Sequence, residues 1–428
     1  MHIVVVGVDH HTAPVEVREQ LAFRPSALPE VLAQLTVAAH APLLEAVILS
    51  TCNRVEVYGV THDDDVAAVQ GALIAFLHRF HNLHPATHAA LFTCRQDTEA
   101  VQHLFNTTCG LNSLIVGEPQ IQGQVRTAYQ VSSEAQTSGP ILHALFRHAV
   151  EAGRRVRTET GIDRNAVSVS QAGVELARRV LGSLQQARIL LVGSGKMSEL
   201  AAKKLLDNGA QSITLVNRTV EKAYQLAQVW GGEVLAFEQL PQALCGADVV
   251  ITSTSAPHTV IHTEHVVAAV ANRSTPLIMI DLAVPRDIDE AVAAVPGARV
   301  YNIDDLAQVV ATNLDRRRSE LRAVEAIVAS EVDRFNQWLS ARAVVPTLND
   351  LREQAEAIRQ GELAKALKRL GPLDERERQI VEALTQGIVN KLLHQPTVRL
   401  KHEAAQGNGV AYAAALQTLF GLGTEASA

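Results

Sequence analysis

The sequence has little of what marks a secreted or membrane protein. Its 428 residues include only four cysteines, at positions 52, 94, 109 and 245, and no CxxC pair. Such scarcity is typical of a reducing cytosol rather than of a disulfide-stapled chain. No apolar run reaches the roughly 18 residues of a membrane span. The apolar run in the opening segment MHIVVVGVDHHTAP is too short for a signal peptide. We therefore expect a cytoplasmic protein without a membrane segment.

Aromatic residues and positive charge are also scarce. Aromatics make up 4% of the chain, which argues against a surface built for stacking nucleic-acid bases. The 38 basic residues face 45 acidic ones, for a formal net charge of −7. A general polyanion-binding protein would be basic. A nucleic-acid partner would therefore have to bind local patches, such as residues 154–157 (RRVR) and 316–318 (RRR).

What is present falls into three parts, as expected for a chain longer than the roughly 300 residues of one core. Residues 1–160 alternate in the order strand, helix, strand, strand, helix, strand, which predicts an α+β domain of ferredoxin-like type. Residues 161–306 carry a strand–glycine turn–helix–strand unit and three more apolar strands, which predicts a Rossmann domain with a doubly wound parallel sheet. Residues 307–428 have a helical pattern with an apolar seam and breaks at Pro346 and Gly371. We expect a long linking helix and an all-helical dimerisation domain there, with a helical cap on the second domain as the alternative.

A thiol occupies a polar turn of the first part. In ILSTCNRVEVYGV, residues 48–60, an apolar run and an alternating run flank Cys52, which predicts strand, turn, strand. A cysteine is not needed as core filler in such a turn. Arg54, two residues later, favours thiolate over thiol. The local pattern alone leaves a reactive cysteine and an inert one equally open.

A dinucleotide site is predicted in the second part. VGSGKMSEL follows a strand and opens a helix, where Gly193 and Gly195 let the backbone approach a pyrophosphate. Ser198 stands where the fingerprint has its third glycine. The next strand ends in VNRT, residues 216–219, without the carboxylate that would bind the ribose of NAD. Arg218 there accommodates a 2′-phosphate, so we predict NADPH as the cofactor.

A nicotinamide and a reactive cysteine together narrow the chemistry. A thiolate can capture an activated acyl group as a thioester, which accepts hydride and leaves as an aldehyde. Cys52 thereby becomes a candidate nucleophile.

The order of motifs resembles the glutamyl-tRNA reductase family over nearly the whole chain. The segments are GVDHHTAPVEVRE, LSTCNRVEVYG, GLNSLIVGEPQIQGQV, GSGKMSELAAKKL, VNRT, IDLAVPRDID, YNIDDL and IVNKLLHQPTVRLK. The resemblance implies NADPH-dependent reduction of glutamyl-tRNA(Glu) to glutamate-1-semialdehyde through a cysteine thioester. That reaction is the first step of 5-aminolevulinate and tetrapyrrole biosynthesis.

The resemblance also implies roles by position. Cys52 would be the nucleophile, and His103 would either donate a proton to the departing ribose oxygen or orient other groups. Arg54 would meet the side-chain carboxylate of the substrate and Glu118 its α-ammonium. The glutamyl pocket would comprise Thr51, Asn53, Arg54, Ser113, Glu118, Pro119, Gln120 and Gln124. The NADPH site would comprise Gly193, Ser194, Gly195, Lys196, Met197, Ser198, Asn217, Arg218 and Thr219.

The implied partners are glutamyl-tRNA(Glu), a second copy of the chain bound through the C-terminal helices, and a glutamate-1-semialdehyde aminotransferase. Two residues depart from many relatives: Asn112 replaces an aspartate and Asp9 an asparagine, which weakens inference about those side chains. Cys109 is interpreted as a small helix-end residue.

Other interpretations remain open. The histidines of HRFHNLHPATH (His78, His81, His84 and His88) have a spacing that can suit metal ligands, but Pro85 breaks the run. We predict no metal there and a solvated helix end instead. Rival functions are a cysteine-dependent semialdehyde dehydrogenase acting on another activated acyl substrate, and an NADP-sensing scaffold with an incidental cysteine. A shikimate-type dehydrogenase, suggested by VNRT and STS, is a minor third.

Overall fold

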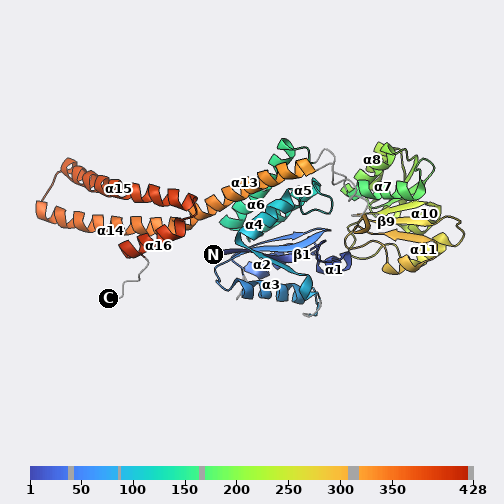
Figure 1. The fold of residues 1–428 in the computed structure, drawn as a ribbon, viewed down its shortest axis with the longest axis horizontal. Helices are drawn as coiled ribbons and strands as arrows, with labels where there is room; N and C mark the ends of the chain where they lie inside the picture. The colour runs from blue at the N-terminus through green and yellow to red at the C-terminus, as the bar shows by residue number, and fades with distance from the viewer. Residues whose placement is uncertain (37–42, 85–87, 163–168, 307–317, 423–428) are drawn as a thin grey trace. The chain divides into compact units, whose positions relative to one another are not determined.

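The computed structural model describes residues 1–36, 43–84, 88–162, 169–306 and 318–422 (Figure 1). It contains two compact units, Met1–Ala329 and Ser330–Ala428. The first unit holds two β-sheets and the second is helical. The predicted fold class, an α+β part, a Rossmann part and a helical part, is thereby confirmed.

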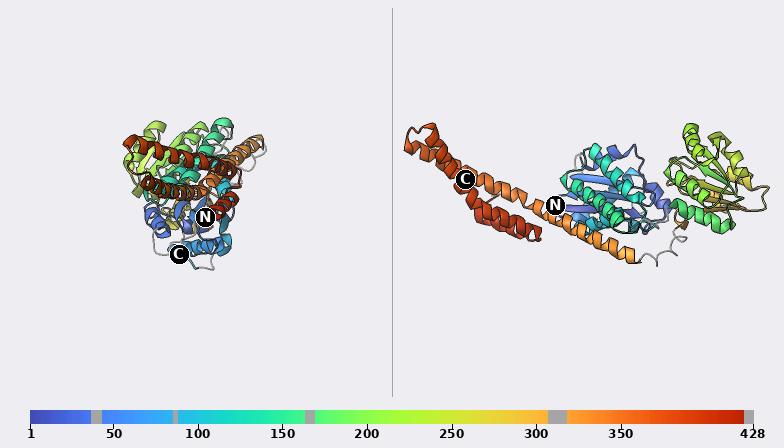
Figure 2. Two further views of the ribbon diagram at one scale, coloured as in Figure 1. Left: turned by 90° about the vertical axis from the view of Figure 1, so that its left-hand side faces the viewer. Right: turned by 90° about the horizontal axis from the view of Figure 1, so that it is seen from above.

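The first sheet is antiparallel, in the order β2-β3-β1-β4. Its strands are β1 (His2–Asp9), β2 (Glu45–Ser50), β3 (Arg54–Thr61) and β4 (Thr93–Gln96). Helices α1 (Val15–Leu21) and α2 (Leu28–Thr36) connect β1 to β2, and α3 (Val66–Phe80) connects β3 to β4, as in a ferredoxin-like fold; α4 (Asp97–Thr108) follows β4. β3 is buried along its whole length, because helices cover both faces of the sheet (Figures 1 and 2). Burial of both faces explains why the strand HIVVVGV is almost continuously apolar.

Two further helices complete this part, α5 (Gln120–Glu134) and α6 (Pro140–Glu159), whereas α7 (Val169–Leu181) packs into the core of the second sheet. Glu45 on β2 ties α6 to the sheet. Its carboxylate accepts the backbone N–H groups of Ile141 at 3.1 Å and Leu142 at 2.6 Å. These N–H groups have no partner within the helix, so a carboxylate at this end is stabilising.

The second sheet is parallel, in the order β10-β9-β8-β5-β6-β7. Its strands are β5 (Arg188–Val192), β6 (Ser212–Asn217), β7 (Glu233–Ala236), β8 (Val249–Thr252), β9 (Leu277–Asp281) and β10 (Ala298–Tyr301). The helices among them are α8 (Lys196–Asp207), α9 (Val220–Trp230), α10 (Leu240–Gly246) and α11 (Thr263–Val270). The strand order reverses between β5 and β8, and ligands of such sheets bind at this switch point. The sequence pattern missed β7, a short strand that is not fully buried and so lacks a clear apolar run.

The helical region consists of α13 (Arg318–Ala343), α14 (Val345–Leu370), α15 (Glu375–Ala405) and α16 (Gly409–Phe420). The predicted breaks are confirmed: Pro346 lies in the first turn of α14, and Gly371 ends that helix. Five buried residues form a small core in the second unit: Val344, Leu348, Leu400, Ala404 and Ala413. Within the described ranges, no helix is both long and apolar enough to cross a membrane.

The second unit leaves a row of large apolar side chains uncovered on α15. Ile380, Leu384, Ile388 and Leu392 are 51–70% exposed. Their spacing of four residues places them in one ridge of the helix. An uncovered apolar row of this length is typical of a surface that packs against another chain.

We predict that this row is part of the contact between two copies. The double substitution Leu384→Glu and Ile388→Glu should weaken self-association by about 100-fold or more, since burial of each side chain contributes roughly 1.5–3 kcal/mol. Sedimentation over a concentration series measures the change. Gln379→Glu is the matched control, because Gln379 is exposed on the same helix outside this row. Unaltered self-association of the double variant would place the contact elsewhere.

Candidate active site

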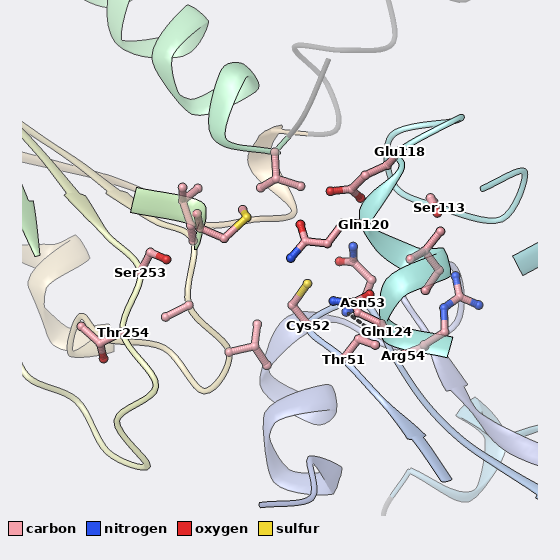
Figure 3. Close-up of a pocket in the computed structure, with 16 residues that line it drawn as sticks. Thr51, Cys52, Asn53, Arg54, Ser113, Glu118, Gln120, Gln124, Ser253 and Thr254 are labelled. Carbon is pink, nitrogen blue, oxygen red and sulfur yellow. Dashed lines mark hydrogen bonds between the residues drawn. The ribbon is translucent and has the colours of Figure 1, made fainter. Parts of the chain in front are cut away.

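The turn between β2 and β3 carries Cys52 and is held by its own polar residues. The Thr51 N–H donates to the Arg54 carbonyl at 2.8 Å, and the Asn53 N–H donates to Thr51 Oγ1 at 3.2 Å. The His10 N–H donates to the Asn53 carbonyl at 2.9 Å. These hydrogen bonds explain the polar run in the sequence, because Thr51, Arg54 and His10 provide partners for the main chain of the turn. Cys52 projects from the turn into a cavity (Figure 3).

The cavity has a volume of about 200 Å³ and combines residues from both sheets of the first unit. Seven predicted pocket residues line it together with Cys52: Thr51, Asn53, Arg54, Ser113, Glu118, Gln120 and Gln124. Gln120 and Gln124 lie one turn apart on α5 and so share a face. The second sheet contributes Met197 of α8, Ser253 and Thr254 after β8, and Leu282–Val284 after β9. Ile121 and Val169 complete the lining.

Glu118 reaches the cavity from the loop between α4 and α5 (Figure 3). Gly117 before it has φ +82°, and a Cβ on it would lie 2.8 Å from the Ile162 carbonyl oxygen, so only glycine fits. The Gly117 N–H donates to the Gly110 carbonyl at 3.0 Å, which fixes the loop. Burial raises the pKa of the Glu118 carboxyl to about 7.

Arg54 lies at one end of a buried polar network. Its guanidinium donates to Glu56 Oε1 at 2.9 Å, to Thr107 Oγ1 at 3.2 Å and to the Asn112 carbonyl. Tyr58 donates to the other oxygen of Glu56 at 2.6 Å. Burial opposes the charged form of Glu56, yet His103 and Arg54 outweigh it and hold the pKa of Glu56 well below its usual range.

His103 belongs to this network and not to the cavity lining. Its Nε2 lies 2.8 Å from Glu56 Oε1, and its Nδ1 lies 3.4 Å from Asn112 Nδ2. Glu56 therefore stands between His103 and Arg54. Pro119 also lies outside the lining: it precedes α5, and its carbonyl accepts a hydrogen bond from Arg157 at 3.1 Å. Pro119 thus marks where the helix bearing Gln120 and Gln124 begins.

The environment of the Cys52 thiol contains opposing influences. Burial and the nearby Glu118 raise the pKa of Cys52 to about 12, although Arg18 and Arg54 lower it. Arg54 thus favours the thiolate, as the sequence predicts, but burial and Glu118 outweigh it in the free protein. The charge of Arg54 is compensated by Glu56, and desolvation disfavours an anion in this cavity. Cys109 is buried at the end of α4, as expected for a helix-end residue.

A second cavity, of about 540 Å³, lies at the switch point of the parallel sheet. Eight of the predicted cofactor residues line it: Gly193, Ser194, Gly195, Lys196, Met197, Asn217, Arg218 and Thr219. Ser198 does not; it is buried in α8, where a small residue permits close helix–sheet packing. Gly193 has φ +105°, and a Cβ there would meet the Ser253 carbonyl oxygen at 2.5 Å. The glycine turn and the N-terminus of α8 therefore fit a dinucleotide pyrophosphate.

Two cations lie at the far end of this second cavity. Arg218 has its guanidinium 5.9 Å from the centroid of the Phe237 ring. Lys222, also in the lining, comes four residues later in the first turn of α9. Sequence reasoning missed Lys222, although its spacing from Arg218 on a helix start could have indicated it.

The two cavities meet. Gln120, Met197, Ser253 and Thr254 line both of them. Ser253 and Thr254 follow β8 at its carboxyl end, where a doubly wound sheet binds ligands. The STS motif, residues 253–255, which the sequence alone links to shikimate-type dehydrogenases, thus lies at this junction.

Other predicted features lie outside the two cavities. His78 is buried against Phe92, so the expectation of a solvated helix end is wrong for this residue. In the described part of the chain, no three His, Cys, Asp or Glu side chains are grouped so that they could hold a metal ion. In the stretch 154–157, Arg154 and Arg155 pair with Glu151 and Glu159. Residues 316 and 317 and the side chain of residue 318 lie outside the described part.

Comparison with known proteins gives consistent matches along the chain. The N-terminal domain of glutamyl-tRNAGlu reductase matches residues 6–160, shikimate/quinate 5-dehydrogenase residues 175–309, and the glutamyl-tRNAGlu reductase dimerisation domain residues 323–422. Glutamyl-tRNA reductases from Chloroflexus aurantiacus and Natranaerobius thermophilus are 46% and 43% identical over 99% of this chain, covering 100% and 93% of those proteins. The solved glutamyl-tRNA reductase of Methanopyrus kandleri is similar over 97% of this chain and 98% of its own, with 33% identity and a TM-score of 0.51.

We predict that Glu118→Gln stabilises the free protein in a pH-dependent way. The folded state raises the pKa of Glu118 from 4.5 to about 7, so the wild-type protein loses stability as pH rises between these values. The variant, which has no charge to desolvate, should gain about 2 kcal/mol over wild type between pH 5 and pH 8. Denaturant unfolding at both pH values measures this gap. Glu134→Gln, at an exposed position at the end of α5, is the control; an equal gap at both pH values would contradict the assigned pKa.

Proposed function

The chain belongs to the glutamyl-tRNA reductase family, and we propose that it reduces glutamyl-tRNA(Glu) to glutamate-1-semialdehyde, the first step of tetrapyrrole biosynthesis, through a thioester on Cys52 with NADPH as reductant. The observation that carries the proposal is the junction of the two cavities. Gln120, Met197, Ser253 and Thr254 border both the thiol and the dinucleotide cleft. A group held on Cys52 is therefore within reach of the nicotinamide end of a cofactor in that cleft.

The charges of the thiol cavity suit a glutamyl group. Among the lining residues that the structure describes, Arg54 is the cation and Glu118 the acid. Arg54 would bind the side-chain carboxylate and Glu118 the α-ammonium. The amides of Asn53, Gln120 and Gln124 supply neutral donors and acceptors between them. Such a pair of opposite charges selects against substrates that lack either ionised group, because the unmatched charge would remain buried and unpaired.

Binding of the ammonium would also activate the thiol. In the free protein the carboxylate of Glu118 raises the pKa of Cys52. An ammonium paired with Glu118 cancels that effect, while Arg18 and Arg54 continue to favour the thiolate. Cys52 would thus be protonated at rest and more nucleophilic once the correct substrate is in place, which protects it from unrelated electrophiles.

The proposed chemistry has two parts. The Cys52 thiolate attacks the ester carbonyl, the C–S bond forms, and the bond to the ribose oxygen breaks as that oxygen takes up a proton. The reduced nicotinamide, when bound, supplies the hydride that turns the thioester into the aldehyde and releases the thiolate. The apolar side chains of Met197, Leu282 and Val284 border the thiol and would limit access of water to the thioester.

His103 is proposed to position Arg54 rather than to touch the substrate. It contacts Glu56, and Glu56 binds the guanidinium of Arg54. Loss of His103 would leave a buried carboxylate short of one partner and would loosen Arg54. A direct proton transfer from His103 to the ribose oxygen is not supported by its place outside the cavity lining.

The phosphate-selective part of the cofactor site is proposed to be Arg218 with Lys222. Both line the dinucleotide cleft, and neither forms an ion pair among the described residues. The match to shikimate/quinate 5-dehydrogenase supports a nicotinamide dinucleotide in general. The choice of NADPH rests on the two cations, since a 2′-phosphate needs positive charge near it.

The proposal extends to partners and location. The dimerisation-domain match supports a homodimer built through the C-terminal helices. The arginines of residues 154–157, of which Arg154 is exposed and Arg155 and Arg157 are half-buried, are candidates for tRNA phosphate contacts, whose strength should fall with salt. Four free cysteines fit a cytoplasmic site of action. A complex with the aminotransferase that uses the aldehyde stays a prediction that co-sedimentation would test.

We predict that Cys52→Ser loses both acyl capture and aldehyde formation, by roughly 1,000-fold or more, because serine lacks an accessible alkoxide at neutral pH. The measurement is radiolabelled glutamate retained on denatured protein, together with aldehyde yield from charged tRNA. Wild type without NADPH should retain label and slowly release glutamate. Cys94→Ser, at an exposed cysteine, should behave as wild type. Aldehyde production by Cys52→Ser would disprove covalent catalysis.

We predict that Arg218→Asp weakens NADPH binding by about 10- to 100-fold, because a charge-assisted contact worth roughly 1.5–3 kcal/mol is replaced by repulsion of the phosphate. NADH binding should improve, as a carboxylate can accept from the free ribose hydroxyl. Fluorescence titration with both dinucleotides measures the ratio. Lys203→Glu makes a similar charge change at an exposed site of α8 and should leave the ratio unaltered. An unaltered NADPH affinity in Arg218→Asp would exclude this residue from the site.

A further inference from the structure

Arg18 is a fully buried cation that lines neither cavity, yet it donates hydrogen bonds to the turn that carries Cys52. It lies on α1, within the motif GVDHHTAPVEVRE, and its side chain is 0% exposed. Its Nη1 donates to the carbonyl of Cys52 itself and to Asn53 Oδ1 at 3.3 Å. Its Nε donates to the Ala13 carbonyl at 3.1 Å. The guanidinium fork therefore fixes the main chain that carries the thiol.

The other arm of the same guanidinium binds the nucleotide-binding part of the unit. Nη2 donates to Oδ1 of Asp304, a residue 286 positions away in the motif YNIDDL. The second oxygen of Asp304 accepts the Val15 N–H at 3.1 Å. The Asp304 main chain is held in turn by Asn302, whose Oδ1 accepts its N–H at 2.8 Å. A single side chain thus joins the turn of Cys52 to the segment that follows β10.

A second ion pair ties the same helix to the same sheet. Arg286, which follows β9, donates its N–H to Glu19 at 2.7 Å and its Nε to Glu19 at 3.0 Å. It also lies 3.2 Å from Glu16. Glu16, Arg18 and Glu19 all belong to α1, which makes this short helix the element through which the two sheets are connected.

We propose that Arg18 is a positioning residue, and that its pairing with Asp304, supported by Arg286, sets how closely the second sheet's loops cover Cys52, so that a thioester is reduced rather than hydrolysed. The loops concerned carry Met197, Ser253 and Leu282, which line the thiol cavity opposite the turn. The inference rests on the proposed function, adds Asp304 and Arg286, to which that function assigns no role, and gives Arg18 a positioning role beside its electrostatic one.

The charges serve a purpose beyond packing. A buried ion pair contributes little net stability compared with apolar side chains of equal size. Its value here is geometric, because a bidentate fork holds two separate segments at fixed distances. It is also electrostatic: Arg18 favours the thiolate of Cys52, and Asp304 compensates that charge while the two sheets are joined.

The test is Asp304→Asn in the full-length protein, which keeps the size of the side chain and removes its charge. With charged tRNA and NADPH, the ratio of free glutamate to aldehyde should rise by about tenfold, the effect of one lost charge-assisted hydrogen bond. Without tRNA or NADPH, Cys52 should be alkylated by iodoacetamide about threefold faster, as the cavity opens and Arg18 loses its compensating charge. Peptide-resolved mass spectrometry separates Cys52 from the other thiols.

Asp305→Asn is the matched control, because Asp305 is the exposed neighbour of Asp304. Its side chain accepts the Asn302 N–H at 2.8 Å. It should match wild type in both readouts. An unaltered product ratio in Asp304→Asn, or an unaltered alkylation rate, overturns the inference. If Asp304→Asn does not fold, Arg286→Gln removes the second tie and must shift the product ratio in the same direction. Failure of wild type to form aldehyde would instead overturn the proposed function, which the alkylation measurement does not depend on.

Discussion

Desolvation of the Cys52 thiol is the constraint on which the rest of the site depends. The proposed thioester would last only if water were kept from it, and burial of the thiol would serve that purpose. The same burial disfavours the thiolate that would form the thioester, and the pKa of Cys52 is raised to about 12. The charges of Glu118, Arg18 and Arg54 act on this balance between thiol and thiolate. Glu118 raises the pKa of the thiol, whereas Arg18 and Arg54 lower it and would favour the anion if, as proposed, a substrate ammonium paired with Glu118.

Behind the cavity, the buried charges of Arg54 and Glu56 are paired within one network. Arg54 binds Glu56, and Glu56 also binds His103 and Tyr58. An isolated charge at these depths would be strongly destabilising, whereas a connected network is tolerated and rigid. Asn112, which replaces an aspartate of many relatives, lies beside His103 Nδ1 at 3.4 Å. A neutral amide there leaves Glu56 as the carboxylate that His103 contacts in this network.

The chemistry arises from the junction of two common folds and not from either alone. A ferredoxin-like sheet can present a cysteine, and a parallel sheet can bind a dinucleotide, without any relation between the two. This is why a semialdehyde dehydrogenase acting on another acyl group was a reasonable rival on sequence grounds. What distinguishes the present arrangement is the set of residues shared by both cavities, with Gln120 at the start of α5 and Ser253 after β8 of the parallel sheet.

The sequence by itself determined the features that depend on neighbours along the chain. The strands around Cys52, the glycine turn at Gly193 and the helix breaks at Pro346 and Gly371 follow from local periodicity and backbone freedom, and all are present. Most of the residues that line the thiol cavity were predicted from motifs shared with a known family. The position of His103, which contacts Glu56 behind Arg54, could not be predicted in this way.

Only the tertiary structure decided what depends on distant partners and on burial. The pairing of Arg18 with Asp304 joins residues 286 positions apart and leaves no periodic mark in the sequence. The sequence indicates that Arg54 lowers the pKa of Cys52, but the larger opposing effects of desolvation and of the Glu118 carboxylate are visible only in the folded chain. Short-range order is encoded locally, but the free energy of a charge is set by everything within a few ångströms of it, which only the folded chain defines.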